Sequence, residues 1–513
     1  MAAPRKVAEL ARVSAGRGMR VDIDDHKILL VRDGDDVRAY AAECPHAKGP
    51  LEEGAVCDGR IVCPWHKATF RVSDGALLEP PALDGLARYP VQVTPDGDIL
   101  VSPDRIVSDT AATATTDTRT LVIVGAGAAG TAAAAALREF GFGGRVLLVG
   151  QEPGAPYDRT SLSKFVMAGT MPPDEAPRLR PPEFFAEQRI ERVEAEIVRL
   201  DVAGRCAHAR DGRRFAYDAA LLATGGVPRW PDIPGAGLPG VHVLRSRQDA
   251  AGILAAVRDE ARVVILGNSF IGLEVASALR ERNLHVVVAV PDAIPFVKQF
   301  GPRLGAMFKS LHEANGVAFR AGHAVRLEAA AGRVAQIVLD DGSRLPADLV
   351  ISGIGVRPAT EFLQGIDLEP DGGIRVDAGM RAADGVYAAG DIAHVPLSSG
   401  GPSARIEHWR VAQQQARVAA HNMLGGSERY DGVPFFWTYH YGKRFEYLGH
   451  AESWDDVVID GDLAGHSFVA LLVREGQVAA VLACQRERET AFLAERMQAP
   501  LAADAALHIM ASA

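Results

Sequence analysis

The sequence predicts a multidomain protein with a small N-terminal all-β domain, two α/β domains and a C-terminal α+β domain. Three observations predict it. Short apolar strands separated by Asp-Gly turns fill the first hundred residues. Two runs of strand, glycine-rich turn, helix and strand begin near residues 121 and 263, and strands alternate again after residue 432 before a final helix from Arg488. A chain of 513 residues is long enough for three or four such domains.

Charge and composition exclude several classes of partner. The formal net charge is −10, which argues against nucleic acid and anionic membrane surfaces. Segment 1–13 carries charges and no apolar h-region, and no run approaches ~18 uncharged apolar residues. The five cysteines form no disulfide framework, which favours a reducing compartment. We therefore expect a cytoplasmic protein with no nucleic-acid or membrane partner.

The most specific motif pairs one Cys with one His in each of two short segments. Cys44 and His46 form the first pair, and Cys63 and His66 form the second, sixteen residues further on. Two thiolates and two imidazoles suit a [2Fe–2S] cluster with Cys on one iron and His on the other. A Cys2His2 zinc site uses the same ligand types, but such sites normally pair Cys with Cys and His with His.

The first hundred residues resemble the Rieske ferredoxin family, with strands expected at 28–31 and 60–62. Cys44, His46, Cys63 and His66 match the metal-ligand positions of that family. Members of the cytochrome bc type carry two further cysteines that form a disulfide, whereas Trp65 stands in the second loop here. The resemblance therefore implies the soluble, ferredoxin-like branch. We interpret the remaining Cys57 as a small, partly buried thiol.

Residues 103–118 are rich in Ser, Thr, Ala and Asp and show no hydrophobic period. This composition is typical of a flexible linker, although a surface loop packed on its neighbours has the same composition. The linker separates the domain at 1–102 from the rest of the chain.

The first α/β unit starts with an apolar strand at 121–124 and a glycine-rich turn. A helix then runs to about Glu139, and a second strand covers 145–149. Glycines in such a turn let the backbone approach a pyrophosphate, which the helix N-terminus binds. An acidic residue after the second strand can bind a ribose. The candidate dinucleotide-binding residues are Gly125, Gly127, Ala129, Gly130 and Glu152.

A second α/β unit begins with a strand at 263–266 and continues as Gly267, Ser269, Ile271 and Gly272. Ser269 replaces the second glycine of the fingerprint, where we expect its side chain to crowd the pyrophosphate. The following strand, 284–290, ends on Val290 instead of an acidic residue, and Asp292 is the nearest substitute. No Arg follows to hold a 2′-phosphate. A Rossmann-like domain that has lost its nucleotide remains an alternative.

Further strands run into glycine at 221–226, 352–358 and 385–391, so the first unit resumes after the second. This order is the plan of flavoproteins with two dinucleotide-binding domains. It assigns 119–246 and 359–425 to FAD, 247–358 to NAD(P), and 426–513 to a C-terminal domain. The added candidates for cofactor contact are Thr224, Gly225, Gly355, Gly390 and Asp391.

Residues 119–500 resemble the ferredoxin reductases that serve Rieske-oxygenase systems, and the whole chain is similar to the Rieske-bearing branch of the apoptosis-inducing-factor-like oxidoreductases. Family motifs recur at 157–164, 406–410 and 434–438. The resemblance implies a glutathione-reductase-like fold with Arg159 and Lys164 beside FAD. It also implies a catalytic pair of Lys164 and Glu274 near the flavin ring, although a surface salt bridge is the alternative. Trp437 is either the aromatic residue near the flavin or a core residue. Three further cofactor candidates come from the second motif, namely Glu407, His408 and Trp409.

The chemistry follows from a missing dithiol. Disulfide reductases of this fold place cysteine beside the flavin, but 157–164 contains none, and we interpret Cys206 and Cys484 as core residues. Electrons from NAD(P)H are therefore expected to pass through FAD to the [2Fe–2S] cluster and on to an external acceptor. A Rieske oxygenase is rejected because no His-x4-His occurs for its mononuclear iron. The alternative is a redox-responsive, nucleotide-binding interaction protein with slow turnover. The acceptor and a homodimer stay open.

Overall fold

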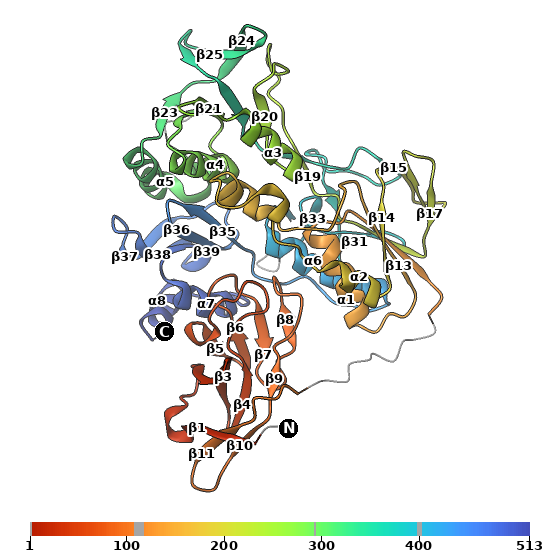
Figure 1. Ribbon diagram of the computed structural model, residues 1–513, viewed down its shortest axis with the longest axis vertical. Helices are drawn as coiled ribbons and strands as arrows, with labels where there is room; N and C mark the ends of the chain where they lie inside the picture. Colours follow the sequence, from red (N-terminus) through yellow and green to blue (C-terminus); the bar gives the residue numbers. More distant parts are fainter. Residues whose placement is uncertain (1–2, 107–116, 292–293, 398–402, 513) are drawn as a thin grey trace.

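The computed structural model describes residues 3–106, 117–291, 294–397 and 403–512. In Figure 1 the N-terminal domain, in red and orange, lies at one end, and the second α/β domain, in green, lies at the other. The blue C-terminal domain lies between them, and the first α/β domain lies to one side. Asp292 falls outside the described residues, as does most of the predicted linker.

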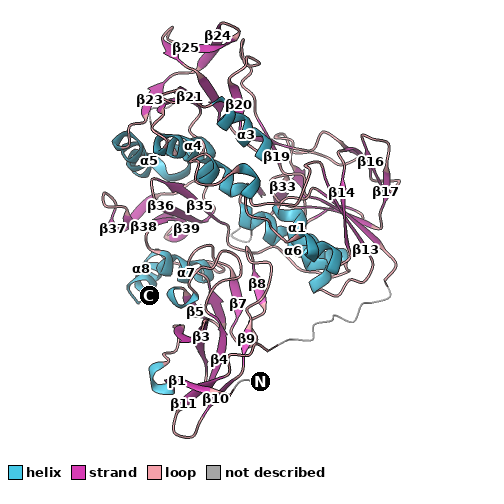
Figure 2. Ribbon diagram, viewed as in Figure 1, coloured by secondary structure: helices cyan, strands magenta, loops and turns pink. Residues whose placement is uncertain are grey.

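The N-terminal domain consists mainly of strands, as Figure 2 shows, in three small sheets, with two short 3-10 helices at Leu10–Arg12 and Leu51–Glu53. Its core is apolar, with Leu29, Tyr40 and Phe70 almost completely buried. The two Cys-His segments connect β4 to β5 and β6 to β7, at the end of the domain that meets the rest of the molecule. In sheet order the strands are β2 (Met19–Ile23), β3 (His26–Asp33), β4 (Asp36–Ala41) and β9 (Arg88–Tyr89); β5 (Ala55–Cys57), β6 (Arg60–Val62), β7 (Thr69–Arg71) and β8 (Leu77–Glu79); β1 (Arg5–Glu9), β11 (Asp98–Val101) and β10 (Val91–Val93).

The first α/β domain takes strands from two separate parts of the chain, which confirms the predicted fold class. Its central sheet is parallel except for β31 at one edge. The sheet order is β14 (Ile190–Glu194), β13 (Arg145–Gly150), β12 (Thr120–Val124), β18 (Ala219–Leu222), β32 (Val386–Ala388) and β31 (Arg381–Ala383). Its helices are α1 (Ala128–Glu139), α2 (Pro182–Glu187) and α6 (Trp409–Met423).

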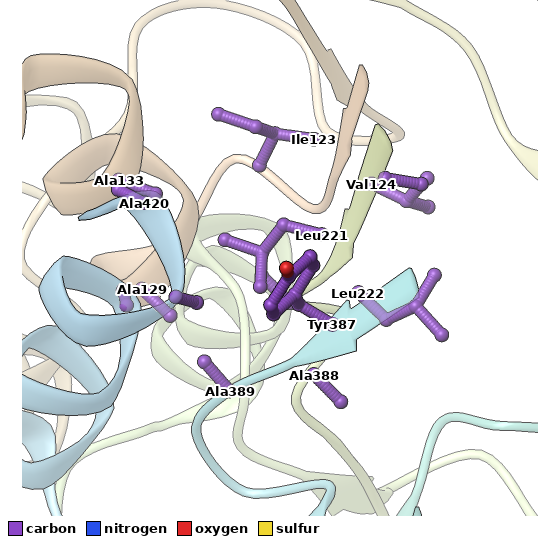
Figure 3. Close-up of a cluster of buried hydrophobic side chains, with 14 of the residues drawn as sticks. Ile123, Val124, Ala129, Ala133, Leu221, Leu222, Tyr387, Ala388, Ala389 and Ala420 are labelled. Carbon is purple, nitrogen blue, oxygen red and sulfur yellow. The ribbon is translucent and has the colours of Figure 1, made fainter. Parts of the chain in front are cut away.

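The core of this domain explains its alanine-rich helices. Figure 3 shows Ala133 of α1 beside Ala420 of α6, with Leu221 and Tyr387 of the sheet next to them. Small side chains let the two helices approach each other and the sheet closely. Smaller strands surround this core: β15 (Ile197–Asp201), β16 (Cys206–Ala209), β17 (Arg214–Ala216), β29 (Leu363–Gln364), β19 (Gly226–Pro228), β28 (Val356–Pro358), β30 (Ile374–Arg375), β33 (Ala393–Val395) and β34 (Ala404–Arg405).

The second α/β domain repeats the plan with its own parallel sheet. The order is β20 (Val241–Val243), β27 (Leu349–Ser352), β21 (Arg262–Leu266), β22 (His285–Val290) and β23 (Ala318–Ala321). The sheet therefore begins a few residues before the predicted boundary at 247. The remaining elements are α3 (Arg247–Ala256), α4 (Phe270–Glu281), α5 (Val297–Ala314), β24 (Ala324–Ala330), β25 (Arg333–Leu339) and β26 (Arg344–Pro346).

The C-terminal domain is an antiparallel sheet with two helices packed on it. The sheet order is β35 (Phe435–His440), β36 (Lys443–Gly449), β39 (Gln477–Cys484), β38 (Ser467–Arg474) and β37 (Asp456–Asp462). One final helix from Arg488 was expected, but the structure has α7 (Glu487–Arg496) and α8 (Ala503–Ser512). Pro500 lies between them, and a proline disfavours helical backbone at the residue that precedes it. No helix in the described residues has the length and apolar character to span a membrane.

Candidate functional site

A cavity of about 1750 Å³ opens between the domains and collects most of the predicted residues. Its wall contains the glycine turn of the first α/β domain, the N-terminal end of α4, strand β35 and both Cys-His segments. The predicted residues that line it are Gly125, Gly127, Ala129, Glu152, Arg159, Lys164, Thr224, Gly225, Ile271, Glu274, Gly390, Asp391, Glu407, His408, Trp409 and Trp437, together with His46 and His66.

The turn between β12 and α1 has the shape that a dinucleotide requires. Gly125 has φ +114°, and a Cβ there would lie 2.1 Å from the Ala223 carbonyl oxygen. A Cβ at Gly130 would lie 1.8 Å from the Gly125 carbonyl oxygen, so α1 packs tightly against the turn. At Gly127, in contrast, a Cβ would meet no protein atom within 4 Å and would fill part of the cavity. This cradle fits a pyrophosphate at the helix N-terminus.

Glu152 follows β13 on the cavity wall but already has protein partners. One carboxylate oxygen lies 2.5 Å from the Arg159 guanidinium, and the other accepts a hydrogen bond of 2.8 Å from the Tyr157 hydroxyl. Glu152 therefore joins the end of β13 to the segment 157–164 and faces the cavity at the same time.

Residues at the crossing of the two α/β domains are held in place by hydrogen bonds. The Thr224 hydroxyl donates to the Ala359 carbonyl at 2.7 Å, and the Gly390 N–H donates to the Gln415 side chain at 2.8 Å. Asp391 accepts from Arg245 at 3.1 Å. The backbone around the cavity is thus fixed by the protein alone.

Lys164 and Glu274 form a buried ion pair at the cavity. The Lys164 Nζ lies 3.0 Å from Glu274 Oε2, and both side chains are about 5 % exposed or less. Ser163 and Thr438 donate to the two carboxylate oxygens at 2.5 and 2.7 Å. The Lys164 Nζ also lies 4.6 Å from the centre of the Trp437 ring, a cation–π distance. A buried carboxylate with three partners is stable as a charged group, so the pair is not a surface salt bridge.

The second fingerprint is built differently from the first. Gly267 has φ +94°, and a Cβ there would lie 2.6 Å from the Gly353 carbonyl oxygen. The Ser269 side chain caps α4 by accepting from the Gly272 N–H at 3.1 Å. Its hydroxyl therefore points to its own helix and occupies one of the N–H groups at the helix N-terminus, and the expected crowding of a pyrophosphate stays a prediction. Gly267, Ser269, Gly272 and Gly355 do not line the large cavity, whereas Ile271 does.

The two Cys-His segments are loops of the same length and hydrogen bonding. Cys-Pro-His-Ala-Lys in one corresponds to Cys-Pro-Trp-His-Lys in the other, so the histidine occupies the third position in one loop and the fourth in the other. Both lysines have φ +60°. In each loop the cysteine N–H donates to the carbonyl five residues on, and the cysteine carbonyl accepts from the lysine N–H: Cys44–Gly49 2.9 Å, Lys48–Cys44 2.9 Å, Cys63–Ala68 2.9 Å and Lys67–Cys63 3.2 Å.

The loops bring like donors together. The Nδ1 atoms of His46 and His66 lie 3.1 Å apart, and the neighbouring Cys63 thiol raises the pKa of the Cys44 thiol. Two nitrogens bound to one metal ion at ~2.0–2.1 Å are separated by about 3.0–3.4 Å at common ligand angles. Burial lowers the pKa of both imidazoles, which favours the neutral form that binds metal. The arrangement fits two nitrogens on one iron and two sulfurs on the other.

The two Cys-His loops meet the cavity directly. The His66 ring lies 5.3 Å from the Trp437 ring, measured between centres. His46 faces Asp158, whose charge partly offsets the burial that lowers the imidazole pKa. Trp437 thus contacts a predicted metal ligand on one side and the Lys164 ammonium on the other.

The remaining thiols do not line the cavity. Cys57, Cys206 and Cys484 are free, and burial raises the pKa of Cys57 to about 11 and that of Cys484 to about 12. All three belong to strands, and Cys484 is a core residue as expected. The expectation that Cys206 is also a core residue was wrong, because it lies at the start of β16 and is only partly buried.

Comparison with known proteins gives three domain matches. A Rieske [2Fe-2S] domain matches residues 3–90, the pyridine nucleotide-disulphide oxidoreductase model matches 119–416, and a reductase C-terminal domain matches 435–509. Apoptosis-inducing factor 3 of Mus musculus is 34 % identical over 492 residues, which cover 93 % of this chain and 80 % of the relative. The chain belongs to the pyridine nucleotide-disulphide oxidoreductase family.

Two further proteins that resemble the chain are reductases by name. The ferredoxin–NAD(+) reductase component of a biphenyl dioxygenase system from Paraburkholderia xenovorans is 36 % identical, covering 69 % of this chain and 87 % of its own. The solved covalent complex of putidaredoxin reductase with putidaredoxin aligns with a TM-score of 0.71 and 29 % identity, covering 77 % and 99 %. The chain is thus an NAD(P)H-dependent FAD oxidoreductase of the ferredoxin reductase type, with a Rieske [2Fe–2S] domain.

Some site residues were missed by the sequence prediction. Thr438 and Ser163 bind Glu274, and Lys67 of the second loop is completely buried. Ser163 and Thr438 lie within the family motifs at 157–164 and 434–438, so the match to those motifs could have identified them as site residues. Lys67 gave none, because a lysine after a metal ligand is expected at the surface.

Proposed function

We propose that the protein carries electrons from NAD(P)H through FAD to a [2Fe–2S] cluster on Cys44, His46, Cys63 and His66, and on to an external acceptor. The contact between His66 and Trp437 at the cavity is the observation that carries this proposal. It places a predicted metal ligand against the wall of the cavity in which the glycine cradle lies.

Electrons and atoms balance in this reaction. One NAD(P)H gives a hydride, two electrons leave singly to two oxidised acceptors, and one proton is released. Bound FAD supplies the exchange between two-electron and one-electron chemistry, and the cluster takes one electron at a time.

The chain supplies position and electrostatics. Gly125, Gly127 and the N-terminus of α1 would hold the pyrophosphate, and Arg159 and Lys164 would lie along the cofactor. The Lys164 ammonium, fixed by Glu274, places a positive charge in the cavity wall. Such a charge stabilises a bound group on which electron density increases during reduction.

The direct experiment is an anaerobic titration of the purified protein with NADH, followed by absorbance and EPR spectroscopy. We expect the flavin to bleach first and a rhombic signal from the reduced cluster to follow. A cluster that stays oxidised beside reduced flavin contradicts the proposal, as does zinc in place of iron.

The second candidate function is a redox-responsive protein that binds nucleotide and turns over slowly. Val290 favours it, because no carboxylate ends β22 where a nicotinamide nucleotide usually finds one. Steady-state oxidation of NADH and NADPH with ferricyanide separates the two candidates. Turnover well below ~1 s⁻¹ supports the second function.

The acceptor and the compartment belong to the same proposal. Similarity to ferredoxin reductases favours a one-electron carrier as acceptor, and the cysteines of the described residues form no disulfide, which favours a reducing compartment such as the cytoplasm. That the protein forms a homodimer remains a prediction, which sedimentation analysis would test.

A further inference from the structure

Lys67 is the most unusual side chain of the N-terminal domain. It directly follows the ligand His66, is 0 % exposed, and adopts a left-handed backbone conformation with φ +60°. Lysine is among the residues that are almost never fully buried without a partner. A buried lysine at this place therefore needs a structural reason.

The reason lies in another domain, 379 residues further along the chain. The Lys67 Nζ lies 2.9 Å from Glu446 Oε2 on β36 and 3.4 Å from the Glu487 carbonyl at the start of α7. The same ammonium donates to the Pro64 carbonyl within its own loop. Lys67 therefore joins the second iron-binding loop directly to the C-terminal domain.

Glu446 is buried and has other hydrogen-bonding partners besides Lys67. It is 2 % exposed and accepts a second hydrogen bond of 2.6 Å from the Thr490 hydroxyl of α7. Arg444 approaches its other oxygen at 3.3 Å. Because Glu446 is already buried and hydrogen-bonded, pairing with Lys67 adds little further cost of removing its carboxylate from water. Without Lys67, the buried negative charge of Glu446 is only partly compensated.

Further contacts also join the N-terminal domain to the rest of the molecule. Ala55 and Val62 pack against Ala491 of α7 in a small apolar cluster. The other contacts are polar and mostly half-buried, and the one made by Arg410 is buried: Arg60 with Glu495 at 3.1 Å, Arg410 with the Pro80 carbonyl at 2.8 Å, Gln414 with Glu79 at 2.5 Å, and Arg180 with Asp84 at 2.5 Å. Figure 1 shows α7 lying against the N-terminal domain beside β5 and β6.

We propose that the N-terminal domain is held permanently on the reductase, and that Lys67 is the positioning residue that fixes the second iron-binding loop against Trp437. Domains joined by a linker move relative to each other by default unless their interface is extensive and apolar. Here a buried ion pair, an apolar cluster and several polar contacts oppose that motion. Electron transfer to the cluster then needs no domain movement, which deepens the proposed function and rests on it.

The equivalent loop supplies a matched control. Lys48 occupies the same loop position as Lys67, with the same φ and the same backbone hydrogen bond, but its side chain is exposed. A Lys48→Met change therefore tests the loop conformation and the loss of a charge near the cluster. A Lys67→Met change tests in addition the contact with Glu446.

The test uses the full-length protein with a protease site placed within residues 107–116. After cleavage, we expect the two parts of the unaltered protein and of K48M to elute together in gel filtration, and we expect NADH to reduce the cluster of the unaltered protein at the same rate as before. In K67M we expect the parts to separate, and cluster reduction to slow at least tenfold while the cluster keeps its absorbance spectrum.

A double variant protects the test against simple misfolding. In K67M/E446L no buried charge is left unpaired, and replacing a buried ion pair by apolar groups is often neutral. Arg444 retains Glu487 at 3.0 Å, and Thr490 retains the backbone carbonyls of α7. We expect the double variant to recover co-elution and most of the rate.

Three results would overturn the proposal: separation of the cleaved unaltered protein, co-elution and normal reduction in K67M, or separation of the parts in K48M as complete as in K67M. The proposed function fails in a different way. If NADH leaves the cluster of the unaltered protein oxidised while the cleaved parts still elute together, the docking stands and the electron route does not.

Discussion

Trp437 is the residue on which the electron route depends most. It touches His66 on one side and lies at a cation–π distance from Lys164 on the other. From the sequence it was either a core residue or a flavin neighbour. Nothing in the sequence indicated its contact with the N-terminal domain, because His66 lies far from it along the chain.

Replacing Trp437 by Leu removes the aromatic ring between the cavity and the cluster. We expect the rate of cluster reduction by NADH to fall roughly tenfold, equivalent to about 1.4 kcal/mol in the barrier, with FAD retained. Stopped-flow absorbance measures it. Trp230 is 50 % exposed, so Trp230→Leu serves as the control, and equal rates in the two variants would contradict the role of Trp437.

Lys164→Met leaves the buried carboxylate of Glu274 without its cation. We expect a loss of about 3–5 kcal/mol in the free energy of unfolding, measured with urea. Lys309→Met breaks only a helix-surface pair with Glu313 at 3.6 Å and should change stability by less than ~0.5 kcal/mol. Similar small effects in both would show that the first pair is not desolvated.

His440 makes stability depend on pH. It is 0 % exposed, and burial lowers its pKa to about 3, with nearby Lys164 acting in the same direction and the Leu273 carbonyl against it. The unfolded imidazole has a pKa of about 6.5, so protonation favours unfolding as the pH falls from 6.5 towards 3.

At pH 5 this effect of His440 amounts to about 2 kcal/mol. His440→Gln should therefore flatten the dependence of unfolding free energy on pH between 6.5 and 5, as measured by denaturant titration at several pH values. The exposed His285→Gln should leave the slope unchanged. An unaltered slope in H440Q would argue that another group titrates.

At the scale of elements, the glycine turn and α1 act as one unit. The sequence was sufficient to predict it, because strand, turn and helix follow each other locally, and close packing requires glycine at Gly125 and Gly130. The second turn was only half predictable. Ser269 occupies a glycine position but also the N-cap of α4, and the capping preference of serine was the signal that the fingerprint comparison overlooked.

Two glycines of the first turn should separate folding from cofactor binding. Gly130→Ala forces a methyl group to 1.8 Å from the Gly125 carbonyl oxygen and should cost ~3 kcal/mol of stability. Gly127→Ala meets no protein atom within 4 Å, so the fold should keep its stability while the purified protein loses FAD. Thermal unfolding and flavin absorbance measure the two effects, and FAD retention in G127A would contradict the cradle.

At the scale of the whole molecule, the sequence predicted the domains but not how they meet. Metal ligands, nucleotide turns and domain order are local patterns, so they could be recognised one at a time. The docking of the N-terminal domain depends on pairs such as Lys67 with Glu446 and Arg60 with Glu495, which lie hundreds of residues apart. No local pattern distinguishes such partners from ordinary surface charges.

The central claim is that the cavity and the cluster of one molecule exchange electrons directly. The most direct measurement mixes the oxidised protein with NADH under anaerobic conditions and follows the cluster by freeze-quench EPR at several protein concentrations. The account predicts a reduced-cluster signal that appears with a rate independent of protein concentration. A rate proportional to concentration, or a flavin that bleaches while the cluster stays silent, would contradict it.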